Sequence, residues 1–321
     1  MVGAGVVGLS TAASLLRSGA DVTCYERAGV VLGERSAGST RIFRLAHVAP
    51  ELVRFAATAR DGFADWAARS GTSMIDPCGC VLSGVDLDDR ARAMTAAGVA
   101  YELVTDGGTR LRVPAADPPS PALVDPGGGI VDVDAVRAFL LAEAGHVVTH
   151  EPVHALEAGA GAVTLRTGGG AHRADAVVVA AGADTPALAA PAGIELPTAL
   201  EHHVRFTFGL DDGPARPAWI DHPADGLATY QHRSGAGRWS VGGTVSAELV
   251  AWERGRDAAT AASRQVVLDH ARERLTVEAD DPREPVLHAR AGHRRRRHLP
   301  AQRPGARGAR GEPDEVRSRA R

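Results

Sequence analysis

The sequence predicts an α/β protein with two domains: a discontinuous α/β domain with parallel strands, and a second domain with an antiparallel sheet. Two stretches in which helical and strand-like segments alternate, 1–76 and 130–200, are separated by a stretch rich in proline and glycine. Beyond residue 200, apolar and polar residues alternate with the period of two that is typical of a half-buried strand. We therefore assign 77–129 and 201–288 to the second domain, which gives each domain enough residues for its own core.

The first element of the α/β domain is a glycine-rich turn. The chain begins MVGAGVVGLS, where Gly3, Gly5 and Gly8 have the spacing G-x-G-x-x-G, and apolar residues then recur at helical spacing as far as Ser18. Residues 21–26 predict a short buried strand that ends in Glu26. The order turn, helix, strand, acid is typical of a Rossmann-like dinucleotide-binding unit. Only two residues precede Gly3, so we place the start of the chain inside the first strand.

Each part of such a unit has a physical task. The first glycine makes a tight turn, the second lets the backbone approach a pyrophosphate, and the third lets the helix pack on the strand. The N–H groups and dipole of the helix N-terminus favour the phosphates. Glu26 is expected to accept the ribose hydroxyls. NAD and FAD share this turn, so the turn itself leaves the dinucleotide open.

The remaining elements follow from hydrophobic periodicity. Residues 131–144 have an apolar stripe at helical spacing, and 146–149 begin a further strand. Residues 174–183 (ADAVVVAAGA) predict a continuous buried strand that ends in a glycine turn. In the second domain we predict strands at 203–208, 226–231 and 238–243, and a helix at 258–275. No periodicity survives after Leu287.

Composition excludes several classes of protein. The chain has neither an uninterrupted run of about eighteen apolar residues nor a basic leader, so we expect a cytoplasmic protein with no membrane span and no secretion signal. Three cysteines are too few for a disulfide framework, and Cys78-Gly79-Cys80 has no second pair nearby, so no metal site is expected. All 36 cationic residues are arginine, in a chain rich in alanine and glycine, which indicates GC-rich coding and a bacterial source.

A second segment with chemical content is SAGSTRIFRLAH at 36–47. Its small residues suit the close approach of a planar ring and a phosphate chain, and it carries Arg41 and Arg44 three positions apart. We expect a helix here, on which residues three apart share one face. Two guanidinium groups on one face suit a carboxylate or the electron-rich edge of a ring, although a solvated helix face is the simpler alternative.

This segment resembles one in the FAD-dependent amino-acid oxidase superfamily, in the group of monomeric sarcosine oxidase and N-methyltryptophan oxidase. The similarity extends to 127–136 (GGGIVDVDAV) and to 180–183 (AAGA), and it loosely covers 1–288. It implies FAD as the cofactor and, as the reaction, oxidation of the C–N bond of a secondary or N-methylated amino acid. It also implies a monomer whose partner is a small amine or amino-acid substrate, with no membrane or nucleic-acid partner.

The resemblance further implies roles for individual residues. Arg41 would lie beside the flavin, Arg44 would bind the substrate carboxylate, and Tyr230 would lie on the substrate side of the flavin. The backbone of Val153 would lie near the adenine. The residues expected to hold FAD are Gly3, Gly5, Val6, Val7, Gly8, Glu26, Arg27, Ser36, Ser39, Thr40, Arg41, Val153, Ala181 and Gly182.

The chain also departs from this family. Family oxidases place a lysine close to the flavin, but this chain has no lysine, and the corresponding position falls near 238–240. The family's flavin-linking cysteine and the strand and turn that follow it have no counterpart, so we expect a chain truncated at its C-terminus. Two alternatives therefore stand beside an active oxidoreductase. One is a catalytically silent nucleotide-binding remnant, and the other is an NAD-linked dehydrogenase, against which the segment 36–44 argues.

The last residues differ in composition from the rest of the chain. Residues 289–321 contain eleven arginines and three acidic residues, whereas the preceding residues contain 25 arginines and 36 acidic residues. This mixture of Arg, Pro, Gly and Ala predicts a disordered basic tail. We interpret it as the product of a frame change in a GC-rich gene rather than as a tail that binds nucleic acid.

Overall fold

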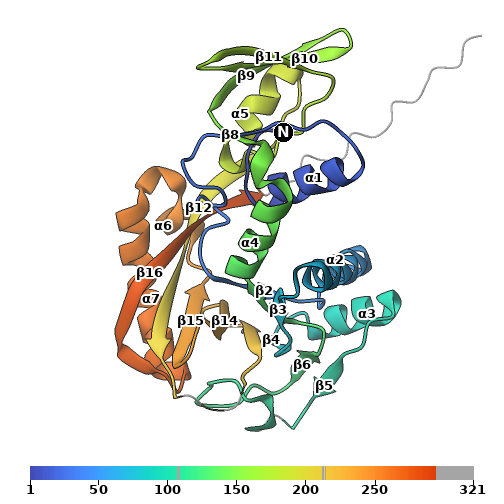
Figure 1. Cartoon of the computed structure of the whole chain (residues 1–321). Helices are drawn as coiled ribbons and strands as arrows, with labels where there is room; N and C mark the ends of the chain where they lie inside the picture. Colours follow the sequence, from blue (N-terminus) through green and yellow to red (C-terminus); the bar gives the residue numbers. More distant parts are fainter. Residues whose placement is uncertain (107–108, 212, 214, 294–321) are drawn as a thin grey trace, which may run out of the picture.

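A computed structural model of the chain describes residues 1–106, 109–211, 213 and 215–293 (Figure 1). Its strands form a parallel pair, two sheets of three strands and one sheet of eight strands. None of the helices in these described stretches is both long enough and apolar enough to cross a membrane. The mixture of parallel and antiparallel sheets with covering helices confirms the predicted α/β class.

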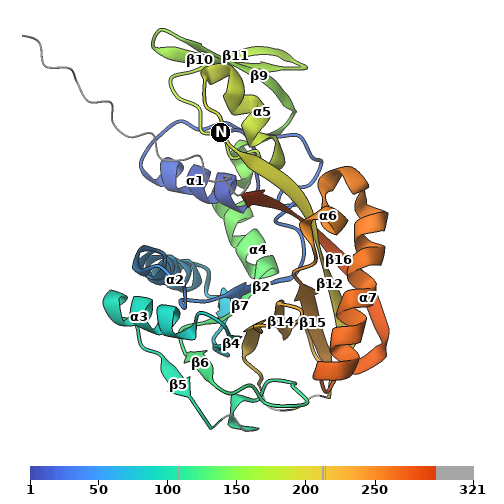
Figure 2. The same cartoon turned by 180° about the vertical axis from the view of Figure 1, so that it is seen from behind.

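Parallel strands surround the glycine-rich turn. Strand β1 (Cys24–Glu26) pairs in parallel with β8 (Val148–His150), and Val2 makes parallel bridges to Tyr25 on one side and Val179 on the other. Helices α1 (Val6–Arg17) and α4 (Val133–Ala144) lie beside these strands (Figures 1 and 2). Their apolar faces share one core, in which Leu9 and Leu140 are fully buried. The turn, helix and strand predicted for this region are therefore present.

The continuous strand predicted at 174–183 is not formed. Strand β11 (Gly170–Ala174) ends where that strand was expected to begin, and it belongs to an antiparallel sheet with β9 (Val153–Gly159) and β10 (Ala162–Thr167). Among the described residues that follow, Val179 makes an isolated parallel bridge to Val2. Two hydrogen bonds hold the pair, from the Val2 N–H to the Val178 carbonyl (3.0 Å) and from the Ala180 N–H to the Val2 carbonyl (2.8 Å).

The eight-stranded sheet has the order β16-β12-β15-β14-β13-β4-β6-β5. All neighbouring strands in it are antiparallel except β13 and β4. Its strands are β4 (Cys80–Gly84), β5 (Glu102–Val104), β6 (Ala122–Asp125), β12 (Thr198–Gly209), β13 (Ala218–His222), β14 (Thr229–Arg233), β15 (Arg238–Gly243) and β16 (Glu278–His293). The predicted strand at 238–243 and the alternating strand at 203–208 are thus confirmed, while the strand predicted at 226–231 lies three residues later at its start.

Helices cover both faces of this sheet. Helix α7 (Arg256–Arg274) packs its buried residues on one face, against Phe206 and Trp239. Helices α2 (Pro50–Ser70) and α3 (Leu87–Ala97) lie on the other side (Figure 1), where Met94 shares a core with Leu82. The short elements are α5 (Thr185–Ala189), α6 (Ala247–Val250) and the 3-10 turns η1 (Thr109–Leu111), η2 (Gly145–Val147), η3 (Gly182–Asp184), η4 (Ala190–Ala192) and η5 (Trp252–Arg254).

The segment that carries the two arginines contains a strand that ends just before Arg44, so the helix expected there is wrong. Strand β2 (Thr40–Phe43) pairs antiparallel with β7 (Gly129–Asp132), which also pairs with β3 (Ile75–Asp76). Pairing with the GGGIVD segment, which is distant in sequence, overrides the local helical spacing. Arg41 lies within β2 and Arg44 directly follows it, so the two arginines do not share one face of a helix.

Regular structure also continues further toward the C-terminus than expected. Strand β16 extends to His293 and pairs along β12, from Gly209 opposite Glu278 to Thr198 opposite His293. Backbone pairing with the edge of the twelve-residue strand β12 needs no side-chain periodicity, which is why the sequence pattern missed it. The first five residues of the predicted basic tail, 289–293, are therefore strand, and the rest, 294–321, lies outside the described residues.

Candidate cofactor and substrate site

A cavity of about 1000 Å³ opens beside the glycine-rich turn. One wall is formed by the turn itself and the end of β1, and another by 32–37 and 180–184. A further wall comes from β12, η5 and the start of α7, with His202, Trp252 and Arg256. A cavity of this size can accommodate a cofactor. It lies beside the glycine-rich turn, where a dinucleotide-binding unit holds its ligand.

The three glycines of the turn differ in what they require. Gly3 has a φ of +97°, and a Cβ atom there would lie 2.5 Å from the Ala180 carbonyl oxygen. A Cβ atom on Gly8 would lie 1.8 Å from the Gly3 carbonyl oxygen. Both glycines are therefore demanded by the fold. Gly5 has ordinary extended backbone angles (φ −74°, ψ −178°), and its Cβ atom would make only an ordinary contact, 3.4 Å from Ser36 Oγ.

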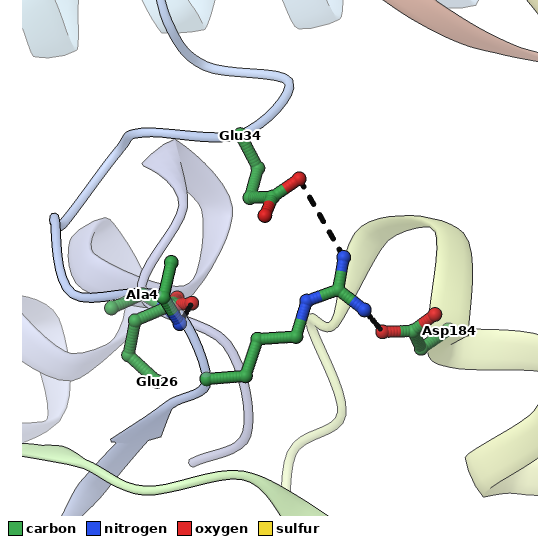
Figure 3. A network of polar contacts seen from close by, with 6 residues as sticks. Ala4, Glu26, Glu34 and Asp184 are labelled. Carbon is green, nitrogen blue, oxygen red and sulfur yellow. Dashed lines mark hydrogen bonds and ion pairs between the residues drawn. The ribbon is translucent and has the colours of Figure 1, made fainter.

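Two side chains hold the turn in place. Glu26 is buried, and its Oε2 accepts a hydrogen bond from the Ala4 N–H at 2.7 Å, a contact visible in Figure 3, while Oε1 accepts one from the Ala28 N–H at 2.8 Å. Ser36 Oγ accepts a hydrogen bond from the Val6 N–H at 3.1 Å and so satisfies one of the unpaired donors at the start of α1. The carboxylate expected to contact ribose therefore also shapes the turn.

An ion-pair bridge crosses the same region. The guanidinium group of Arg27 pairs with the Asp184 carboxylate on one side and with Glu34, at 3.5 Å, on the other (Figure 3). All three residues line the cavity. The bridge links the end of β1 to the 3-10 turn η3, and it is partly exposed, so salt will screen it.

Most residues expected to hold the cofactor line this cavity. They are Gly3, Gly5, Val6, Val7, Glu26, Arg27, Ser36, Val153, Ala181 and Gly182. The other four are not part of its lining. Gly8 packs against Gly3, the Ser39 carbonyl accepts a hydrogen bond from the Val133 N–H, and Thr40 and Arg41 lie in β2.

Arg41 lies directly behind the cavity wall. Its guanidinium group donates hydrogen bonds to the carbonyls of Arg35 (3.3 Å) and Ala37, which both line the cavity, and to the Thr40 carbonyl (2.8 Å). Burial lowers the pKa of Arg41, and the nearby Tyr230 partly offsets this effect. The structure therefore brings together two of the three residues expected to be catalytic.

The ring of Tyr230 packs over a glycine on the neighbouring strand. Gly242, on the neighbouring strand β15, is paired with Tyr230, and a Cβ atom on Gly242 would lie 2.1 Å from the phenol ring. The ring therefore lies flat over Gly242 and toward β12, where it stacks on His203 with a centroid distance of 6.3 Å. Any side chain at 242 would displace the tyrosine.

Arg44 lies in a different group of residues. It acts electrostatically on Arg90, His47 and Cys80, at the side of the eight-stranded sheet that α3 covers. Next to it, the buried Asp125 accepts hydrogen bonds from the N–H groups of Leu45 (2.6 Å) and Ala46 (3.1 Å). Burial raises the pKa of Asp125, and these backbone donors oppose that rise. Asp125 thus fixes the path of the chain immediately after Arg44.

Several residues at the site carried no sequence signal. Arg90, Arg205 and His232 are buried charged or polar residues whose partners come from distant segments. His202 and Trp252 stack at 4.6 Å in the cavity wall that β12 and η5 form. The alternation at 203–208 could have shown that Arg205 shares a strand face with His203, but it does not show what that face meets.

The cysteines have no metal partners in the described stretches. Cys24, Cys78 and Cys80 are free thiols, and no group of His, Cys, Asp and Glu residues suited to a metal ion occurs among the described residues. Burial raises the pKa of Cys24 to about 11 and also raises that of Cys80. These thiols are therefore protonated at neutral pH and act as small apolar residues of the core.

The parallel strands, the glycine turn and the adjoining cavity define a dinucleotide-binding protein. The family model described as FAD dependent oxidoreductase (DAO) matches residues 1–312, beyond the expected limit of 288. The chain therefore belongs to the FAD-dependent oxidoreductase family, with FAD as its cofactor. This finding argues against the alternative of an NAD-linked dehydrogenase. No curated protein matches the chain.

Solved structures share this fold. NikD, described as an unusual amino acid oxidase essential for nikkomycin biosynthesis, superposes with a TM-score of 0.76 at 21% identity, over 90% of this chain and 80% of NikD. Glycine oxidase from Geobacillus kaustophilus has a TM-score of 0.70 at 18% identity, over 91% of this chain and 82% of that chain. L-Proline dehydrogenase from P. horikoshii has a TM-score of 0.67 at 16% identity, over 90% and 80% respectively.

The residues of the cavity fit FAD. Gly5 is required neither by backbone strain nor by a protein contact, and it borders the cavity, so its missing side chain leaves room for a phosphate to approach the backbone. Arg35 also lines the cavity, and its buried Nη2 has no hydrogen-bond partner among the described residues. A phosphate oxygen would supply the missing acceptor.

Proposed function

We propose that this FAD-dependent oxidoreductase oxidises the C–N bond of a secondary or N-methylated amino acid. The observation that carries the proposal is the course of 36–44. This segment begins in the wall of the cofactor cavity, continues as β2 with Arg41 behind that wall, and ends at Arg44 beside the eight-stranded sheet. One short stretch thus connects the cofactor cavity to two cationic groups suited to an amino-acid substrate.

The residues have distinct proposed roles. Gly5 and the other lining residues of the glycine-rich turn hold the phosphates of FAD, and Glu26 holds its ribose. Val153 lies at the adenine. Arg44 binds the substrate carboxylate, Arg41 lies beside the flavin, and Tyr230 borders the substrate. When bound, FAD would supply the acceptor for a hydride equivalent from the carbon next to the amine nitrogen. The chain orients the substrate, and water then hydrolyses the imine product.

The pairing of strands supports the proposed division into domains. Strand β4, from 77–129, pairs with β13, from 201–288, inside the eight-stranded sheet. The parallel strands β1 and β8, from 1–76 and 130–200, likewise pair with each other. We therefore propose that 1–76 and 130–200 form the FAD-binding domain and that the other two segments form the substrate domain.

Steady-state kinetics with matched substrates test the proposed substrate class. The full chain, loaded with FAD, is assayed with N-methylated amino acids and with the same amino acids lacking the methyl group, using an artificial electron acceptor. We expect kcat/KM to be higher for each N-methylated substrate. Preference for the unmethylated partners would contradict the proposal, and FAD binding without any turnover would favour the catalytically silent alternative.

The role of Arg44 is tested in the same assay. Arg44→Met should raise KM for the amino acid by about tenfold or more, because a charge-assisted contact to the carboxylate is lost. The matched control is Arg54→Met. It removes an exposed arginine whose guanidinium group donates a hydrogen bond to the Ala96 carbonyl, near the end of α3. An unchanged KM in Arg44→Met would remove this residue from the substrate site.

A further inference from the structure

Trp252 presents an aromatic ring to the cofactor cavity. The chain has four tryptophans, of which Trp219 and Trp239 are buried in the core that α7 covers and Trp66 is half-buried. Trp252, in η5, is 43% exposed and lines the cavity. An indole that stays accessible in the wall of a cofactor-sized cavity is typical of a ligand contact, because aromatic side chains form much of such walls.

One face of this indole rests on His202. The two ring centroids are 4.6 Å apart, and the ring planes differ by 19°. His202 is 5% exposed, and neither of its ring nitrogens has a hydrogen-bond partner among the described residues. A buried imidazole without hydrogen bonds costs stability, so the contribution of His202 to this wall is its flat packing on Trp252. Because His202 covers one face of the indole, the opposite face is the one left for a ligand.

The backbone on both sides of Trp252 is also held in place. Ala251 makes an antiparallel bridge to Glu201 on β12. The Gly255 N–H donates a hydrogen bond to the Trp252 carbonyl at 3.2 Å and closes η5. Gly255 has a φ of +80°, which glycine adopts without strain, and it leads the chain into α7. A side chain that is already fixed loses little freedom when a ligand stacks on it, so this wall is suited to a planar ring.

FAD has two planar rings, the adenine and the isoalloxazine, and either can stack on an indole. We propose that Trp252, positioned by His202, stacks on one of the two rings of FAD bound in this cavity. The α/β domain supplies the glycine-rich turn to the cavity, whereas Trp252 belongs to the segment 201–288. Both proposed domains would then hold the cofactor. The proposal rests on FAD occupying the cavity but not on the identity of the amine substrate.

Titration of the FAD-free full chain with FAD tests this contact. Trp252→Leu should weaken FAD binding by about tenfold, because stacking on an aromatic side chain is lost. Trp252→Phe should retain most of the affinity. The matched control is Phe55→Leu, which removes an exposed aromatic ring on α2, outside the cavity lining, and should leave the dissociation constant of FAD unchanged.

A double-mutant cycle tests the positioning role of His202. His202→Ala should weaken FAD binding when Trp252 is present, because the indole loses its support. The same substitution should have little further effect in the Trp252→Leu background. Equal effects in both backgrounds would show that His202 does not act through Trp252.

Flavin fluorescence identifies the ring that stacks. An indole in contact with the isoalloxazine quenches its fluorescence by electron transfer, so bound FAD should be brighter in Trp252→Leu if the isoalloxazine is the partner. Unchanged brightness together with weaker binding of ADP would assign the adenine. If neither the brightness nor the affinity for ADP changes, the stacking contact does not exist.

Two further outcomes would overturn the proposal. One is a Trp252→Leu protein that binds FAD as tightly as the parent, and a raised KM for amino acids in that protein would assign Trp252 to the substrate. The other needs the parent protein alone, and so applies even if the variants do not fold. Oxidation of Trp252 by N-bromosuccinimide, followed by peptide mass spectrometry, should slow at least fivefold at saturating FAD, whereas an unchanged rate would exclude the contact.

Discussion

At the scale of single residues, the three glycines of the first turn separate structural from functional demands. Gly3 and Gly8 are required because the backbone of another residue occupies the place of a side chain. Gly5 lies in an ordinary backbone conformation and faces the cavity. Identical residues in one motif therefore carry different information, and only Gly5 reports on a ligand.

This difference predicts opposite effects of two substitutions. Gly5→Val should leave thermal unfolding of the protein without FAD nearly unchanged but weaken FAD binding about tenfold or more, which is ~1.4 kcal/mol. Gly8→Ala should destabilise the fold itself by about 1–3 kcal/mol, because its Cβ atom overlaps the Gly3 carbonyl oxygen. Urea unfolding and FAD titration distinguish the two. Loss of the fold in Gly5→Val would show that position 5 is structural.

Asp125 carries a second prediction at this scale. Its carboxylate accepts three N–H groups of buried backbone, from Leu45, Ala46 and Gly127. Asp125→Ala leaves these donors without an acceptor and should lower the free energy of unfolding by roughly 2–4 kcal/mol. The exposed Asp117→Ala is the control and should change it by less than about 0.5 kcal/mol. Similar urea midpoints for both variants would contradict this account of the segment after Arg44.

At the scale of elements, α7 introduces a dependence on pH. His270 lies on its buried face, and burial lowers the pKa of this histidine below its ordinary value of 6.5. Below about pH 6.5 the unfolded chain therefore binds more protons at this position than the folded chain does. The free energy of unfolding should fall as the pH decreases through this range, by at most about 1.4 kcal/mol per pH unit for this group.

Urea unfolding between about pH 7 and pH 5 checks this prediction. His270→Gln should show a shallower decline than the parent, whereas His154→Gln, which removes an exposed histidine on β9, should follow the parent. Equal slopes for the parent and His270→Gln would mean that His270 is not the group responsible.

The elements also show what could be predicted from the sequence. The helix at 131–144, the strand at 238–243 and the helix at 258–275 correspond closely to α4, β15 and α7, because each buries an apolar face of regular period. Strand β2 was missed because its partner, β7, lies almost ninety residues away in the sequence. Strand β16 was missed because its pairing depends on the backbone edge of β12.

At the scale of the whole molecule, the site joins segments that are distant in sequence. The glycine-rich turn, Glu26 and the segment 36–44 could be picked out from the sequence because they are local motifs. Arg205 and His232 were not, since their contacts with Thr40 span 165 and 192 residues. The long strand β12 (Figure 2) makes this possible, because it carries His202 in the cavity wall and Arg205 near Arg41 and Tyr230.

The most direct test of the central claim is a single reduction of bound flavin. The full chain is saturated with FAD, made anaerobic and mixed with an N-methylated amino acid while the visible absorbance of the flavin is followed. We predict that the absorbance disappears with a rate that saturates as the substrate concentration rises, and that an aldehyde or an equivalent carbonyl product appears in equal amount. Flavin that stays oxidised with every secondary and N-methylated amino acid would contradict the proposed function.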